Sequence, residues 1–250
     1  MRLLAAALFA MSVLVAPGCT RSGSDARPTI VASFYPLAWA AERVAGNGYR
    51  VVNMTPAGAE PHDIELSPRD VEKVRDADLV VYLSGGFQPA VEEAVADRDG
   101  PSVDARGGDA DPHVWLDPVR FSRVVAELGR ALGRPEAARR VEAELRELDR
   151  RYRVALRNCT RSTFVTDHAA FGHLARRYGL TQLALTGVSP EAEPLLSNRL
   201  AETVAREAGV HVSSLDPIEG LSAERLDEGA DYESVMLDDL NALAKALGCR

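Results

Sequence analysis

Four side chains of metal-binding type occupy similar places in the sequence, each beside a predicted strand. His62 lies in a loop after a strand that ends near Met54, His113 precedes a helix, His168 directly follows a strand, and Asp216 follows the last strand. In open α/β sheets ligands bind at the carboxyl edge of the strands, so we expect these side chains to meet there. Three imidazoles and one carboxylate make a tetrahedral site that suits Zn²⁺, with Mn²⁺ as the alternative, although Mn²⁺ favours more oxygen ligands.

Two further histidines are predicted to lie outside this site. His173 comes five residues after His168 on one predicted helix, about 140° around the helix axis, so it should face elsewhere. His211 lies inside a predicted strand between two valines, where a partly buried sheet residue is expected.

The segments around the first two candidate ligands alternate between strand and helix. We predict strands at 29–33, 50–54, 78–83 and 101–105, and helices at 36–45, 68–76 and 89–96. Each of these helices carries proline in its first turn, where the missing N–H is harmless. This alternation predicts a mostly parallel sheet with helices on both faces.

A helical stretch separates this lobe from a second one. Helices are predicted at 118–132 and 135–156, and the second has one apolar stripe, formed by Val141, Leu145, Leu148, Tyr152 and Leu156. Alternation resumes with strands at 162–166, 181–185 and 210–215 and helices at 169–178, 199–208 and 232–247. The predicted fold class is α/β: two lobes, each with a mostly parallel sheet flanked by helices, joined by one long linking helix.

The beginning of the sequence predicts export. Residues 3–16 are apolar apart from Ser12, a length typical of the core of a signal peptide and too short to span a bilayer. The run ends at Ala16-Pro17-Gly18-Cys19, which resembles the lipidation box of bacterial lipoproteins. We therefore expect a signal peptide at 1–18, acylation of Cys19 with ordinary signal-peptidase cleavage as the alternative, and a polar tether at 19–28.

The two remaining cysteines are Cys159 and Cys249. In an exported chain an even number of cysteines indicates a disulfide, with two free thiols as the alternative. The net charge of −8 argues against nucleic acid as a partner, because binding to phosphates needs a basic surface.

Several segments together resemble one family along the chain from about residue 30 to the end. The segments EPHDIELSP, DPHVWLDP, TDHAAFG, LDPIEGL and DYESVMLDDLNALAKALG are similar to the zinc and manganese solute-binding proteins of ABC transporters (the cluster A-I group). The resemblance implies a site between two lobes, at 29–117 and 159–250, separated by a helical linker at 118–158. His62 and His113 would come from the first lobe, and His168 and Asp216 from the second.

The same resemblance implies that Glu60 supports the site or serves as an alternative ligand. It also implies an ABC permease as partner and a monomer held at the outer face of the membrane by its lipid. The sequence departs from the family in three ways. Only Gly107–Asp111 stands where many relatives have a His- and Asp-rich loop, the linking helix looks a couple of turns short, and the second lobe looks one helix and one strand short.

The expected function is therefore extracytoplasmic metal binding for an importer, and the chain is not expected to be an enzyme. One alternative is a secreted metal-dependent hydrolase, in which a water molecule would occupy the fourth metal position. Against it, the sequence has no HExxH motif. Another alternative is a metal-binding surface adhesin.

Overall fold

The computed structural model describes residues 27–185 and 214–250. The predicted signal peptide, Cys19, the predicted helix at 199–208 and His211 all lie outside these residues. Across the two described ranges, no helix has both the length and the apolar character needed to cross a membrane.

The first sheet is fully parallel and has four strands in the order β2-β1-β3-β4. Its strands are β1 (Thr29–Ala32), β2 (Arg50–Asn53), β3 (Leu79–Tyr82) and β4 (Ser102–Asp104). All four were predicted within two residues at each end, and the parallel α/β sheet is confirmed. Because the strands are parallel, their carboxyl ends and the loops that follow β2 and β4 leave from the same edge.

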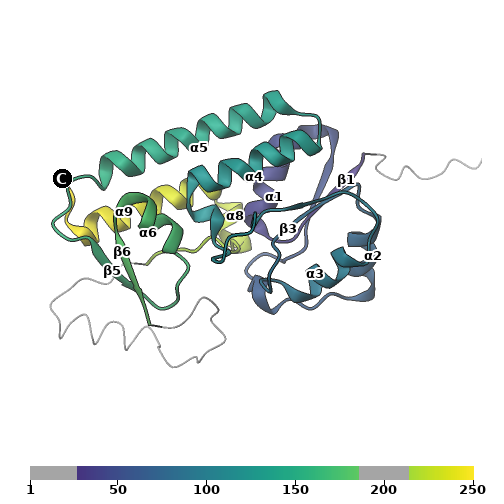
Figure 1. The fold of residues 1–250 in the computed structure, drawn as a ribbon, viewed down its shortest axis with the longest axis horizontal. Coiled ribbons are helices and arrows are strands. Elements are labelled where there is room, and N and C mark those ends of the chain that lie inside the picture. Colours follow the sequence, from purple (N-terminus) through teal and green to yellow (C-terminus); the bar gives the residue numbers. More distant parts are fainter. Residues whose placement is uncertain (1–26, 186–213) are drawn as a thin grey trace, which may run out of the picture.

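Three helices, α1 (Tyr35–Ala45), α2 (Pro68–Asp76) and α3 (Pro89–Ala96), connect these strands, and each has proline in its first turn. Alternate strand residues face different cores: Ile30 packs with α1, whereas Val31 packs with α2 and α3. The helices therefore cover both faces of the sheet (Figure 1).

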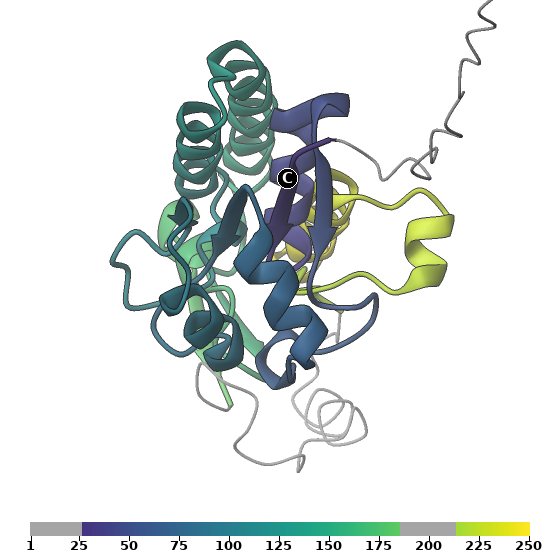
Figure 2. The ribbon, with the colours of Figure 1, turned by 90° about the vertical axis from the view of Figure 1, so that its right-hand side faces the viewer.

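Two long helices follow the first sheet, α4 (Pro118–Ala131) and α5 (Pro135–Ala155), and they lie side by side (Figures 1 and 2). Gly129 permits their close approach, because a Cβ there would lie 2.4 Å from the Cβ of Ala138. The predicted apolar stripe of α5 is buried, from Val141 to Tyr152.

The second sheet has two parallel strands among the described residues, β5 (Thr163–Thr166) and β6 (Thr181–Ala184). Phe164 faces the core, whereas the side chain of Val165 on the opposite face is 59% exposed. A third strand was predicted at 210–215. Residues 210–213 lie outside the described part, and Leu215 is not in a strand.

Among the described residues, three helices belong to this part of the chain: α6 (Gly172–Tyr178), α8 (Ala223–Asp227) and α9 (Tyr232–Leu247). Helix α6 begins three residues later than predicted, because residues 168–171 form turns after β5. The short helix α8 was not predicted; the Ser222 side chain caps it by accepting the N–H of Arg225.

One continuous core joins the two sheets. It includes residues of β1, α1, α4, α5, β5 and α9, among them the fully buried side chains of Tyr152 and Tyr232. A disulfide joins Cys159 to Cys249, the pairing predicted from the cysteine count, and so ties the end of α9 to the segment before β5. The division of the chain into residues 29–117, 118–158 and 159–250 stays a prediction.

Candidate metal centre

His62 lies in a one-turn 3₁₀ helix, η2 (Pro61–Asp63), in the connection between β2 and α2. Proline opens this turn, and the imidazole packs edge-on against Phe87 with ring centroids 4.2 Å apart. The side chain is only 7% exposed. In this orientation, with the ring packed against Phe87, the Nε2 atom is buried.

His113 directly precedes another short 3₁₀ helix, η3 (Val114–Leu116), and is fully buried. The Asp111 carboxylate accepts the backbone N–H of His113 at 3.2 Å and pairs with its Nδ1 at 2.9 Å. A carboxylate that holds Nδ1–H leaves the lone pair of Nε2 available to a metal and fixes the plane of the ring.

His168 lies in the turn between β5 and α6. Thr166, the last residue of β5, donates its hydroxyl to the backbone carbonyl of His168 at 2.7 Å. Nδ1 of His168 lies 3.2 Å from an oxygen of Asp167, and the side chain is 12% exposed. The third imidazole is thus held in the same manner as the second, but nearer to the surface.

The carboxylate that meets the three imidazoles belongs to Glu219. Its oxygens lie 3.3 Å from Nε2 of His113, 3.7 Å from Nε2 of His62 and 3.7 Å from Nε2 of His168. The three predicted histidines are therefore brought together as the sequence suggested.

Asp216 does not take its predicted place beside these rings, so the structure contradicts that assignment. Its Oδ1 accepts the backbone N–H of Ile218 at 2.8 Å, and its Oδ2 pairs with Nη1 of Arg225 at 2.6 Å. Both carboxylate oxygens are thus engaged within the loop and with α8. The physical reason is local: an aspartate that bonds the N–H two residues ahead turns its side chain back on its own backbone.

Four buried polar atoms of this cluster lack a hydrogen-bond partner. They are Nε2 of His62, His113 and His168, and Oε1 of Glu219. Potential ligand atoms of His62, His113 and Glu219 all lie within 4.8 Å of one another. Buried polar atoms are rarely left unsatisfied, because desolvation then goes uncompensated. Three imidazoles and a carboxylate that converge in this way fit a tetrahedral cation such as Zn²⁺.

The cluster is also electrostatically coupled. Burial raises the pKa of Glu219, but the imidazoles of His113, His168 and His62 close to its carboxylate outweigh burial and hold that pKa well below its usual range. For His113, burial lowers the pKa, and the carboxylates of Asp111 and Glu219 more than reverse this. An ionised carboxylate faces the rings, which is the charge that a bound cation requires.

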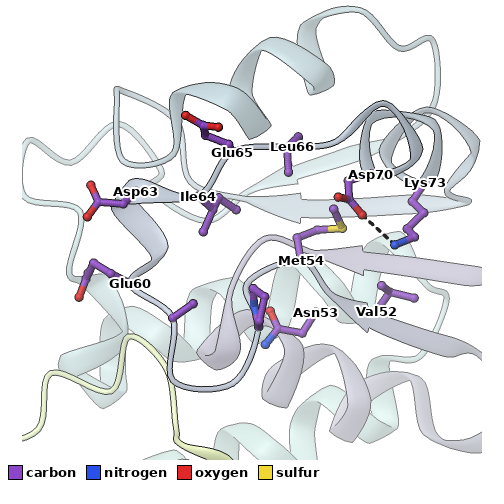
Figure 3. Close-up of a pocket in the computed structure, with 12 residues that line it drawn as sticks. Val52, Asn53, Met54, Glu60, Asp63, Ile64, Glu65, Leu66, Asp70 and Lys73 are labelled. Atoms are coloured by element: carbon purple, nitrogen blue, oxygen red, sulfur yellow. Dashed lines mark hydrogen bonds and ion pairs between the residues drawn. The ribbon is translucent and has the colours of Figure 1, made fainter.

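Glu60, the predicted supporting residue, lies at the rim of the cluster, 3.9 Å from Nε2 of His62. Burial, followed by its contact with Glu219, raises the pKa of Glu60 to about 7. Glu60 also lines a surface pocket of about 630 Å³, together with Asp63 at the same end (Figure 3). The cluster is therefore bordered by carboxylates on the side of this pocket.

His173 takes no place in the cluster. Its Nε2–H donates to the backbone carbonyl of Asp111 at 3.0 Å, and its Nδ1 accepts from Arg176 at 2.8 Å. This buried imidazole links α6 to the segment that carries His113.

Glu219 is the residue that sequence reasoning missed. A usable signal was present, because three Asp-Pro pairs occur and their aspartates behave alike. Asp111, Asp117 and Asp216 each accept the N–H of the residue two positions ahead. Aspartate before proline favours such a turn, which points to the next carboxylate in Leu215–Leu221 as the one that faces the imidazoles.

Known proteins carry the same fold and family pattern. The model of the ZnuA family, described as zinc-uptake complex component A, periplasmic, matches residues 30–197. The chain belongs to this family. Among related proteins, the zinc-binding protein AdcA of Streptococcus pyogenes serotype M1 is 31% identical over 288 residues, which cover 88% of this chain and 56% of AdcA. The chain thus spans about half the length of the AdcA relatives it matches.

A ZnuA protein and a ZnuA-like domain match along nearly their whole length. The high-affinity zinc uptake system protein ZnuA of Bacillus subtilis is 27% identical, with 97% of this chain and 95% of that protein covered. The crystal structure of the Zn(II)-bound ZnuA-like domain of Streptococcus pneumoniae AdcA superimposes with a TM-score of 0.76 at 32% identity, and covers 88% of this chain and 99% of that domain.

Proposed function

We propose that this protein binds Zn²⁺ outside the cytoplasm and delivers it to the permease of an ABC importer. The observation that carries the proposal is the convergence of four buried, unpartnered ligand atoms, three imidazole nitrogens and one carboxylate oxygen. Membership of a family described as a zinc-uptake component supports zinc as the cargo. The set of three nitrogen donors and one oxygen donor favours Zn²⁺ over Mn²⁺.

The proposed ligands are His62, His113, His168 and Glu219. The first two hold the cation from the side of the four-stranded sheet, and the other two hold it from the side of β5 and α8. Asp111 and Asp167 orient the rings of the second and third histidines through Nδ1. Binding brings a 2+ charge to an ionised carboxylate and three imidazole nitrogens. The unsatisfied polar atoms then make bonds to the metal.

Four protein ligands also favour a carrier over the alternative of a hydrolase. A catalytic zinc keeps a position open for water, whereas four protein ligands fill a tetrahedral shell. A metal-binding adhesin remains the other alternative, and host-ligand binding by the metal-free protein would distinguish it.

The partner and location follow from the same proposal. The expected partner is an ABC permease, and the expected location is the outer face of the membrane, with acylated Cys19 as the anchor and the protein itself a monomer. Metabolic labelling with a fatty acid, compared with a Cys19→Ala variant, tests the anchor.

Competition titration with Zn²⁺ and Mn²⁺, combined with elemental analysis of the purified protein, tests the cargo. We expect one Zn²⁺ per chain, preference for Zn²⁺, and strongly weakened binding in Glu219→Gln. Glu144→Ala is a matched control, because Glu144 is an exposed carboxylate paired with Arg43. Wild-type zinc affinity in Glu219→Gln would refute the proposed ligand set, and absence of zinc binding by the wild type would refute the function.

A further inference from the structure

Contacts at Asp216 and Pro217 attach the loop that carries Glu219 to other parts of the molecule. The backbone N–H of Asp216 donates to Asp239 of α9 at 2.9 Å, and the Asp216 side chain pairs with Arg225 of α8. The carbonyl of Pro217 accepts the indole N–H of Trp115 at 2.7 Å. Trp115 lies only two residues after His113, so this bond ties the loop to the segment that holds a proposed ligand.

The same loop has an unusual backbone conformation. Ile218, directly before Glu219, has φ = 55°, and it is the one non-glycine residue with positive φ among residues 27–185 and 214–250. A β-branched residue is strained in this region, and such strain persists only where surrounding contacts hold it. Here the contacts are the bond from the Ile218 N–H to Oδ1 of Asp216 and the complete burial of the Ile218 side chain.

Asp111 provides an internal comparison. It also precedes a proline, accepts the N–H of the residue two positions ahead, and stands directly before a proposed ligand segment. Its carboxylate additionally contacts the ring of His113. Asp216 makes the same turn, but its second oxygen binds Arg225 instead of a ligand. Both aspartates thus shape the loop that presents a ligand.

From these contacts we infer that Asp216 is a positioning residue, which holds the strained loop at Ile218 so that the carboxylate of Glu219 reaches the imidazoles. This inference rests on the proposed metal site. In this role Asp216 affects metal binding only through Glu219. Arg225 of α8 in turn holds the Asp216 carboxylate in place.

A double-mutant cycle tests this role. Zn²⁺ affinity is measured for wild type, Asp216→Ala, Glu219→Gln and the double variant, and the absorption spectrum of bound Co²⁺ reports the coordination geometry. We expect Asp216→Ala to weaken Zn²⁺ binding by about 10-fold to 100-fold, the usual range for residues that orient a ligand. Its Co²⁺ spectrum should move toward that of Glu219→Gln. The double variant should bind as Glu219→Gln does, because contributions that act through one ligand are not additive.

Two further variants separate positioning from direct ligation. Asp216→Asn keeps an oxygen that can accept the Ile218 N–H, so it should retain most of the Zn²⁺ affinity if Asp216 only positions the loop. If Asp216 were itself a metal ligand, Asp216→Asn would bind Zn²⁺ as weakly as Asp216→Ala. Arg225→Met should weaken binding less than Asp216→Ala and have no effect in the Glu219→Gln background. It provides a second measurement if Asp216→Ala does not fold, which circular dichroism of the metal-free variants shows.

Additive losses in the double variant, or wild-type affinity and spectrum in both Asp216→Ala and Arg225→Met, would overturn the inference. These results leave the proposed function intact, because wild type and Glu144→Ala would still bind Zn²⁺. Failure of wild type and Glu144→Ala to bind Zn²⁺ would instead refute the function together with the inference.

Discussion

The two halves of the proposed metal site are supported in different ways. On one side, His62 and His113 follow strands of a four-stranded sheet whose backbone ladder and core fix the loops. On the other, β5 and β6 form a two-stranded sheet in the described residues, and Glu219 lies in a loop held by side-chain hydrogen bonds. Side-chain contacts can therefore place a ligand where the sheet does not extend.

The largest expected effect is on zinc binding at the first half. His113→Ala should reduce Zn²⁺ affinity by roughly 100-fold to 1,000-fold, which is about a quarter of the free energy of a four-ligand zinc site. His168→Ala should cost less, because His168 is nearer the surface and water can replace its ring. Competition titration of both variants measures this order, and a larger loss in His168→Ala would reverse the comparison.

The next largest expected effect is on stability and comes from the disulfide between Cys159 and Cys249, in the half that carries His168 and Glu219. Cys159→Ala combined with Cys249→Ala should lower the free energy of unfolding by about 2–4 kcal/mol, because the unfolded chain loses a constraint. Denaturant unfolding of the metal-free protein measures this. Mass spectrometry after alkylation without reductant should find neither thiol free; two alkylated thiols would contradict the pairing.

Native-state hydrogen exchange compares the two sheets directly. In the metal-free protein, amides of β5 and β6 should open at a free energy lower by on the order of 2 kcal/mol than those of β1 and β3. The reason is burial: Val165 and Leu183 are 59% and 53% exposed, whereas Val31 and Val80 are fully buried. Equal protection in both sheets would show that the second is as stable as the first.

The smallest expected effect concerns Asp239. Burial, with the nearby charge of Asp216, raises the pKa of Asp239 to about 8, although the N–H of Asp216 opposes this. Below about pH 4 the Asp239 carboxyl is protonated in both the folded and the unfolded protein. Between about pH 4 and pH 8 only the folded protein keeps this proton, so the free energy of unfolding falls as pH rises. Asp239→Asn should therefore stabilise the metal-free protein, by about 1 kcal/mol more at pH 8 than at pH 7. Thermal unfolding at the two pH values measures it, and a gain independent of pH would contradict the raised pKa.

Local patterns were enough to predict most of the described elements. Helices α2, α3 and α9 have the predicted bounds, because proline or a capping residue marks where each begins. Strands β1 and β3 were predictable from short apolar runs, and the parallel order follows from their alternation with helices. The short helix α8 was missed because five residues carry too little periodicity to detect.

The sequence by itself determined the kind of site: three histidines placed after strands, in an exported chain of a recognisable family pattern. Only the tertiary structure shows which carboxylate faces the three imidazoles. Asp216 and Glu219 are three residues apart and chemically alike, so residue type and spacing alone do not separate them, although the Asp-Pro turn at Asp216 favours Glu219. Which carboxylate faces the rings depends on the backbone at Ile218, whose positive φ redirects the chain. It also depends on contacts of the loop with Arg225, Asp239 and Trp115. Such contacts form only when the whole chain folds, and they leave Glu219 as the carboxylate that faces the three imidazoles.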